Sequence, residues 1–191
     1  MKTELLVSKK SIKLSPAEDT QYVLLPKGKV FVEVLLDKEG ISVELLILLS
    51  LKDKEEIRLS TQSAHKVPNT NCMVSVKGVL FDAAKSEYVG KILIEKGAQQ
   101  TVSFLEDNML SVGSKTKNHS QPILEIEAND VKASHGATTG RVSEDQIYYL
   151  MSRGLTRKDA EKTVIEGFFE AVISQITDEK VRTKVRKELN A

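Results

Sequence analysis

The segment most informative about the fold is LEIEANDVKASHGATTGRVSEDQIYYLMSRGLTRKDAEKTVIEGFFEAVISQI, residues 124–176, because the spacing of its apolar residues changes partway along. Up to about residue 135, apolar and polar side chains alternate, which is typical of a β-strand. From Ser143 onward the apolar residues recur at helical spacing. The sequence therefore predicts a β domain over residues 1–142, followed by a helical domain over residues 143–191.

Upstream of this boundary, from about residue 28, short segments with the same alternation follow one another. VFVEVLL (residues 30–36) and CMVSVKGVL (residues 72–80) show it most clearly. Their β-branched residues, and the Gly, Asn and Asp between segments, favour strands over helices. Many short strands without intervening helices are compatible with a sandwich, a barrel or a β-solenoid. The alternation by itself does not choose among these three.

Capping signals mark the predicted helices. Ser143 and Gln146 form a capping-box pair, and Gly154 occupies the place where a helix ends in a left-handed residue. Thr156 and Asp159 begin a second helix in the same way. We expect one helix before Gly154 and a longer one after Thr156.

The second predicted helix carries an apolar stripe, and Thr177 is predicted to cap a short third helix. The stripe consists of Ala160, Val164, Ile165, Phe168, Phe169, Val172 and Ile176. Such a stripe either packs on the chain's own β domain or docks a partner, and its spacing fits both.

Composition argues against several classes of protein. The chain has 28 Lys and Arg against 27 Asp and Glu, so bulk attraction to nucleic acid or an acidic membrane is not indicated. No apolar run is long enough to cross a bilayer, and the start lacks a signal-peptide pattern. The single cysteine, Cys72, argues against a disulfide or a multi-cysteine zinc site. We expect a cytoplasmic protein that binds neither nucleic acid nor membrane.

Three motifs carry a resemblance to a known family: ASHGAT at residues 133–138, DQIYYLMSRGL at 145–155 and GFF at 167–169. In this order and spacing they resemble the C-terminal region of the SufB/SufD family of iron–sulfur cluster assembly proteins. Residues 77–112 resemble the family's final β-helix rungs, whereas residues 1–70 match poorly. Family members are commonly much longer, so the chain looks like a short form. The resemblance implies a right-handed parallel β-helix with a C-terminal helical subdomain.

The resemblance also implies a role. Proteins of this family are scaffold subunits, not enzymes, and they bind a SufC-type ABC ATPase through the C-terminal helices. They pair through their β-helices, so a homodimer or a heterodimer with a SufB-like protein is expected, with a transient iron–sulfur cluster at or near the interface. The chain lacks a Walker-type glycine loop, so we expect it to bind no nucleotide itself. The implied ATPase dock comprises Tyr148, Leu150, Arg153, Val164, Phe168, Phe169 and Val172.

His135 is the main candidate ligand for iron or a cluster. It lies where the SufD branch has its functional histidine. The SufB branch has a glutamate at the position of Gly136 and a cysteine near Glu106 or Asp107, and neither is present here. The site is therefore SufD-like. Without the resemblance, a histidine on an apolar strand face is more often a satisfied core residue than a ligand.

Five other residues are candidate ligands. Cys72 shares a face with apolar neighbours, so a buried inert thiol is favoured over a weak cluster ligand. His119 is predicted to lie in a polar turn, and His65 on the surface. Glu106 and Asp107 offer oxygen atoms, but adjacent residues of a strand point to opposite faces and do not act as a pair.

Two alternative functions stay open. One is a β-solenoid that oligomerises or regulates other assembly proteins, with no metal role for His135. The other is a β-helix enzyme acting on polysaccharide, which needs paired carboxylates and aromatic residues that hold sugars. Aromatic residues are only 5% of the chain, which argues against the enzyme.

Overall fold

The structure, a computed structural model, describes residues 1–189, which form a β domain followed by three helices. The strands are β1 (Lys2–Leu6), β2 (Ser11–Leu14), β3 (Thr20–Leu24), β4 (Lys29–Leu36), β5 (Ser42–Leu51), β6 (Glu56–His65), β7 (Asn71–Leu80), β8 (Lys85–Ile94), β9 (Thr101–Ser111), β10 (Lys117–Ile126) and β11 (Val131–Arg141). The helices are α1 (Glu144–Ser152), α2 (Arg157–Ile173) and α3 (Glu179–Leu189).

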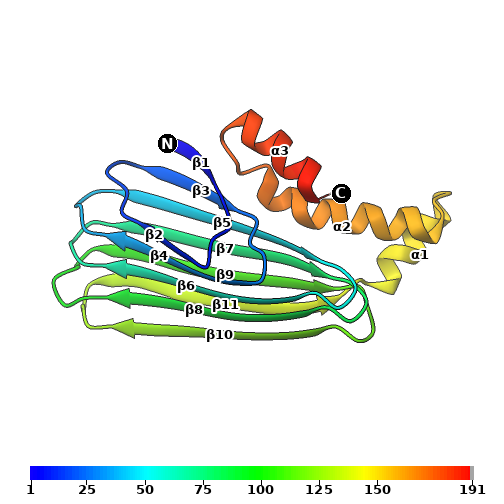
Figure 1. The fold of residues 1–191 in the computed structure, drawn as a ribbon, viewed down its shortest axis with the longest axis horizontal. Helices are drawn as coiled ribbons and strands as arrows, with labels where there is room; N and C mark the ends of the chain where they lie inside the picture. Colours follow the sequence, from blue (N-terminus) through cyan, green and yellow to red (C-terminus); the bar gives the residue numbers. More distant parts are fainter. Residues whose placement is uncertain (190–191) are drawn as a thin grey trace.

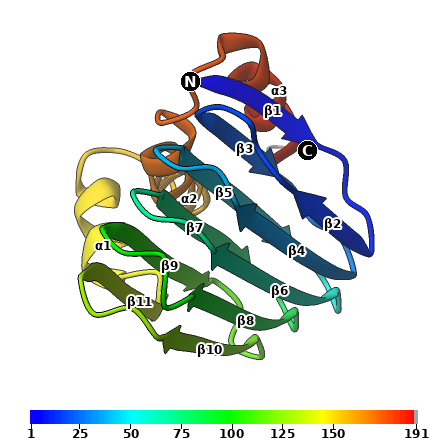
Figure 2. The same cartoon turned by 90° about the vertical axis from the view of Figure 1, so that its left-hand side faces the viewer.

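The strands form a parallel β-helix with two strands in each turn. Odd-numbered strands make one sheet in the order β1-β3-β5-β7-β9-β11, and even-numbered strands make the other in the order β10-β8-β6-β4-β2. Every neighbouring pair is parallel, and the chain crosses to the other sheet after each strand (Figures 1 and 2). The β-helix expected from the resemblance is confirmed.

Stacking of equivalent residues in successive turns builds the core between the sheets. Leu45 of β5, Val74 of β7 and Leu105 of β9 are register partners, and all three are buried. Inward apolar positions alternate with outward ones along β4, as the sequence predicted. The solenoid also includes β1 to β3, in the part of the chain that resembles the family poorly.

A second core lies between the helices and the outer face of the odd-numbered sheet. Phe169, Val172 and Ile173 of α2 pack there with Val23 and Leu46 of the sheet. Figure 1 shows α2 and α3 beside this sheet, with α1 beyond the strand ends. The apolar stripe of α2 therefore packs on the chain's own β domain.

The strand and helical parts meet where the sequence predicted. β11 ends at Arg141 and α1 begins at Glu144. The Ser143 hydroxyl accepts a hydrogen bond from the backbone N–H of Gln146 at 3.4 Å, and Gly154 has a φ of +98° just after α1. Since the helices share a core with the sheet, the division into two domains stays a prediction.

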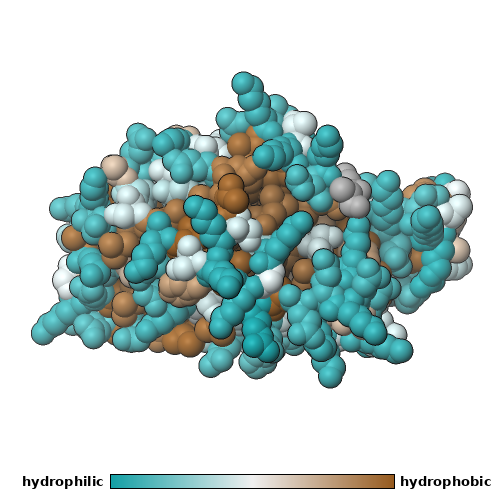
Figure 3. All heavy atoms as spheres, viewed as in Figure 1, coloured by the Kyte–Doolittle hydropathy of each residue, from teal (hydrophilic) through white to brown (hydrophobic). Residues whose placement is uncertain are grey.

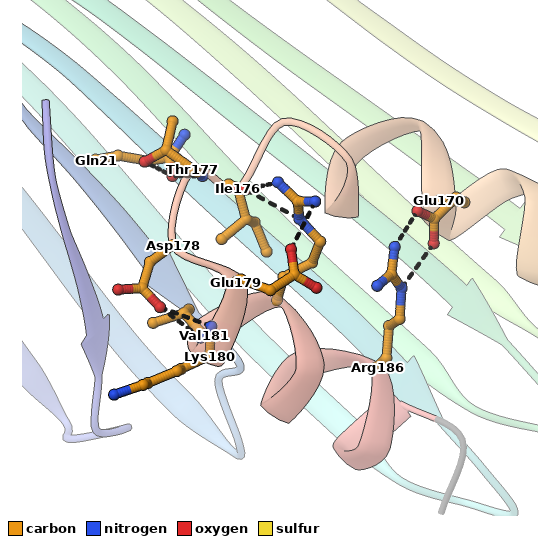
Figure 4. Close-up of polar contacts among 10 residues, drawn as sticks. Gln21, Glu170, Ile176, Thr177, Asp178, Glu179, Lys180, Val181 and Arg186 are labelled. Carbon is orange, nitrogen blue, oxygen red and sulfur yellow. Dashed lines mark hydrogen bonds and ion pairs between the residues drawn. The ribbon is translucent and has the colours of Figure 1, made fainter.

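The start of α3 differs from the prediction. The Asp178 carboxylate, not the Thr177 hydroxyl, accepts hydrogen bonds from the first backbone N–H groups of α3. The N–H of Thr177 instead donates to Oε1 of Gln21 at 2.9 Å (Figure 4), and Nε2 of Gln21 donates to the carbonyl of Gln175 at 2.8 Å. Gln21 is fully buried, so one side chain of β3 holds the α2–α3 turn against the sheet.

An ion pair holds α3 against α2. Nε of Arg186 donates to Oε2 of Glu170 at 3.1 Å, and the second guanidinium contact reaches Oε1 at 2.5 Å (Figure 4). Both side chains are partly exposed, so the contact fixes the geometry of α3 more than it stabilises the fold. None of the helices in residues 1–189 is long and apolar enough to cross a membrane.

Candidate functional site

The candidate site lies at the end of the solenoid formed by β10 and β11. Each of these strands is the outermost strand of its sheet, so one side of each carries backbone N–H and C=O groups without a neighbouring strand (Figure 2). Exposed strand edges of this kind pair readily with another chain. We call the surface formed by β10 and β11 the open end.

His135 lies on β11 at the open end. Its register partner is Leu105, so His135 stands on the inward side of the strand, yet it is exposed because no further turn covers it. Ser134 and Gly136 are exposed too, and a Cβ added at Gly136 would meet no atom within 4 Å. Within residues 1–189 the imidazole makes no side-chain hydrogen bond, so His135 is not a satisfied core histidine.

Apolar side chains surround the open end. Ile123, Leu124 and Ile126 of β10 are among the large hydrophobic residues that remain exposed. Leu124 and Ile126 are register partners of the buried Ile92 and Ile94, so they continue the core columns into the last turn. The core is thus left uncovered at this end, next to two free strand edges.

Cys72 lies away from His135, inside the solenoid. It is buried on β7, and burial raises the pKa of its thiol to about 12, with a smaller opposing effect from the Ser63 hydroxyl. Two strand spacings and two residues of register separate its Cα from that of His135, which corresponds to about 12 Å. The structure places Cys72 as a buried protonated thiol and does not bring it to His135.

The predictions for the other two histidines are wrong. His65 is not on the surface: it is fully buried, with Nδ1 at 2.8 Å from the Thr70 hydroxyl and Nε2 at 3.0 Å from the Ser103 hydroxyl. Burial lowers its pKa to about 4. His119 is not in a turn but on β10, exposed and beside Glu87.

Glu106 and Asp107 point to opposite faces of β9, as predicted. Glu106 is exposed, whereas Asp107 is fully buried inside the solenoid. Neither carboxylate oxygen of Asp107 has a hydrogen-bond partner within residues 1–189. Burial raises the pKa of Asp107 to about 6, and the nearby Ser120 hydroxyl opposes that shift in part.

The residues of the implied ATPase dock fall into three groups by exposure. Phe169 and Val172 are buried against the sheet, while Leu150, Val164 and Phe168 are half-buried. The exposed members are Tyr148, 76% exposed, and Arg153, whose guanidinium stacks on Tyr149.

Two exposed residues of α1 were not among the residues predicted to bind the ATPase. Tyr149 and Met151 are exposed to solvent beside Tyr148. We call Tyr148, Tyr149 and Met151 the α1 face. Its signal in the sequence is three large side chains within four residues of a short helix that buries only Ile147.

A groove of about 800 Å³ runs beside α2 and α3. Its lining includes Phe81, Ile165, Phe169, Lys162, Glu166 and Arg186. Figure 3 shows a hydrophobic patch in the upper middle of the view, at the level of α3 in Figure 1, bordered by hydrophilic side chains. The groove therefore offers an apolar floor and charged rims of both signs.

The fold and the site define a class: a parallel β-helix with a histidine at its open end and amphipathic helices along one sheet. Residues 29–168 match the family model described as "SUF system FeS cluster assembly, SufBD core domain". This match covers well over half of the chain, so the chain belongs to the SufBD family of iron–sulfur cluster assembly proteins.

Curated relatives agree with the family assignment. The chain is 36% identical over 126 residues to the iron–sulfur cluster assembly protein SufD of Bacillus subtilis, covering 66% of this chain and 29% of that protein. It is 35% identical over 109 residues to SufD of Escherichia coli, covering 57% and 26%. It is 29% identical over 150 residues to the SufBD family protein slr0076 of Synechocystis, covering 78% and 33%. The chain thus spans about a third or less of the length of these relatives.

Proposed function

We propose that the chain is a scaffold subunit of a SUF-type iron–sulfur cluster assembly complex. In this role it binds a SufC-type ATPase through its helices and pairs with another subunit through the open end, where a nascent cluster is held as cargo. The observation that carries the proposal is His135, exposed on the terminal strand between small residues and next to two free strand edges.

Cluster binding at this site requires a second subunit. Iron–sulfur clusters are held by several ligands, most often thiolates. Within residues 1–189 no three His, Cys, Asp and Glu side chains are grouped so that they hold a metal ion. His135 therefore contributes one ligand, and the partner that covers the open end supplies the others. A homodimer supplies a second His135, whereas a SufB-like partner supplies its own ligand set.

The α1 face is the surface of the helical part that best fits the ATPase. Exposed tyrosines are frequent anchors of protein interfaces, because they bury much area at little cost in side-chain entropy. Phe169 and Val172 take no direct part in this dock, since they pack on the sheet.

Light scattering of the chain mixed with the SufC-type ATPase of the same genome tests the docking. Removing residues 142–191 is unsuitable, because it uncovers Val23, Leu46 and Leu48 of the sheet. We therefore choose the double variant Tyr148→Ala/Tyr149→Ala, with Val7→Ala, another exposed apolar position, as control. The expected result is a stable wild-type complex whose Kd rises at least tenfold in the double variant only. No complex with the wild-type chain would leave the oligomerising or regulatory function as the better proposal.

Anaerobic reconstitution with iron and sulfide tests the ligand. We expect His135→Ala to lose most of the iron and sulfide that the wild-type chain retains with its partner. Ser134→Ala, at the adjacent exposed position, and Cys72→Ala, in the core, are expected to retain both. Metal content and visible absorbance after desalting measure the result. Equal retention by His135→Ala and the wild type would rule out direct ligation and favour a metal-free role.

A further inference from the structure

Buried oxygen atoms without partners gather in the last turns of the solenoid. Among residues 1–189, six buried side-chain nitrogen or oxygen atoms lack a hydrogen bond, and all six are oxygens. Five of them belong to β8, β9 and β10: Oγ of Ser86, Oδ1 and Oδ2 of Asp107, Oδ1 of Asn118 and Oγ of Ser120. Buried polar atoms normally have hydrogen-bond partners, so the group of unpartnered oxygens indicates a candidate ligand site.

The register brings these residues to one part of the interior. Asn118 is the strand partner of Ser86, and Ser120 is the partner of the inward-facing Tyr88. Asp107 faces them from the other sheet, with the Ser120 hydroxyl near its carboxylate but outside hydrogen-bond geometry. All of these side chains lie on the inward faces of their strands, in the last turns of the solenoid, and Asn118 and Ser120 belong to β10 of the open end.

The Asn118 amide and the Tyr88 hydroxyl are already engaged, whereas the Ser86 and Ser120 hydroxyls are not. Nδ2 of Asn118 donates to the Thr139 hydroxyl at 2.8 Å, which fixes the amide and leaves its carbonyl oxygen free. The Tyr88 hydroxyl is paired with that of Thr61 at 2.7 Å. The site thus holds one carboxylate, one carbonyl oxygen and two hydroxyl oxygens, with no cationic side chain among them, which suits a cation better than an anion.

We propose that this oxygen site binds a partly hydrated monovalent cation, sodium or potassium, with Asp107 and Ser120 as the protein ligands nearest the ion. A donor set made only of carboxylate, carbonyl and hydroxyl oxygens selects hard cations over soft ones. One carboxylate neutralises a monovalent ion, whereas a divalent ion leaves a net positive charge in a buried site, which is costly. His135 is not among the donors of this site, but its register partner Leu105 lies two residues before Asp107 on β9, so the site lies beside the proposed cluster ligand and is tested separately from it.

Thermal unfolding of the full chain at constant ionic strength tests the site. Choline chloride is replaced stepwise by sodium chloride or potassium chloride, so that only the identity of the cation changes. Ligand that binds the folded state alone raises the Tm, by about 3 to 6 °C at tenfold the Kd for a chain of this size. We expect a saturating rise with sodium, potassium or both.

The adjacent carboxylates of Asp107 and Glu106 provide a test variant and its matched control. Asp107→Asn is expected to abolish the cation-dependent rise, and Glu106→Gln, on the outer face of the same strand, is expected to retain it. Ser120→Ala is expected to shift the midpoint to at least fivefold higher concentration. Line broadening in sodium-23 NMR supplies a direct readout, expected for the wild type and lost in Asp107→Asn.

Three results would overturn the proposal. The first is equal Tm values in choline, sodium and potassium. The second is an undiminished cation response in Asp107→Asn. The third is a rise with ferrous iron alone, which would assign these oxygens to the cargo metal. None of these outcomes bears on whether the ATPase binds the α1 face, so the two proposals fail separately.

Discussion

Phe169→Ala is expected to destabilise the protein by about 3 to 5 kcal/mol, because it removes the ring at the centre of the core between α2 and the sheet. Phe169 is 5% exposed, and its ring lies edge-on to that of Phe168, with 6.0 Å between the centroids. Phe169 belongs to the same buried cluster as Leu46 and Leu48 of β5, so truncating its ring leaves a cavity in that cluster. Urea unfolding followed by far-UV circular dichroism measures the loss.

Two variants make the comparison specific. Phe168→Ala removes a half-buried ring and its contact with the Lys77 ammonium, 4.7 Å from the ring centroid, so a loss of only about 1 to 2 kcal/mol is expected. Tyr148→Ala, at an exposed position of α1, is expected to change stability by less than about 0.5 kcal/mol. Similar losses at Phe168 and Phe169 would contradict the packing described here.

The second large effect concerns pH, through His65. Its folded-state pKa of about 4 lies below the ordinary 6.5. Between pH 4 and 6.5, His65 is therefore protonated in the unfolded chain and neutral in the folded chain. The stability supplied by neutral His65 is therefore complete above pH 6.5 and is lost as the pH falls toward 4. The difference corresponds to about 3 kcal/mol.

Asp107 acts in the opposite direction over nearly the same range. Its folded-state pKa of about 6 lies above the ordinary 3.8, so the folded chain holds a proton that the unfolded chain releases. Ionising the buried carboxylate costs about 3 kcal/mol, so this contribution to stability is complete below pH 3.8 and is lost as the pH rises through 6.

The two effects therefore offset each other in the wild-type chain and separate in variants. Unfolding free energies between pH 4 and 7.5, in choline buffers free of sodium and potassium, are the measurement. Asp107→Asn should gain stability relative to the wild type as the pH rises through 6, and His65→Gln should gain as the pH falls below 6.5. His119→Gln, at an exposed histidine, is the control. Parallel curves for all four proteins would contradict the buried states of His65 and Asp107.

Alternation of apolar and polar residues predicted β4, whose two faces differ in burial, but not β3, whose two faces are both buried. β4 alternates between buried and half-exposed positions, so its pattern is visible in the sequence. All five residues of β3 are buried, because one face lies in the solenoid core and the other lies under the helices. A strand covered on both faces has no period of two, and β3 therefore gave no clear signal.

Local signals predicted helix ends well, except where a distant residue intervened. Ser143 and Thr156 cap their helices as expected, because a cap depends only on the next three residues. Thr177 does not cap α3, since its backbone N–H is held by Gln21, far away in the sequence. Asp178 takes over as the cap.

Three features could be predicted from the amino-acid sequence alone: the family, the change from strands to helices after residue 141, and His135 as the residue to test. These features depend on short motifs and on the spacing of apolar side chains. Which side chains are covered could be read only from the folded structure, because burial depends on neighbouring turns and on the helices. The folded structure placed His65 inside and His135 outside, buried Asp107 but not Glu106, and turned Phe169 onto the sheet. The stacking of successive solenoid turns thus buries His65 and Asp107, although no local sequence pattern indicates their burial. His135 stays exposed because β11 is the last strand of its sheet.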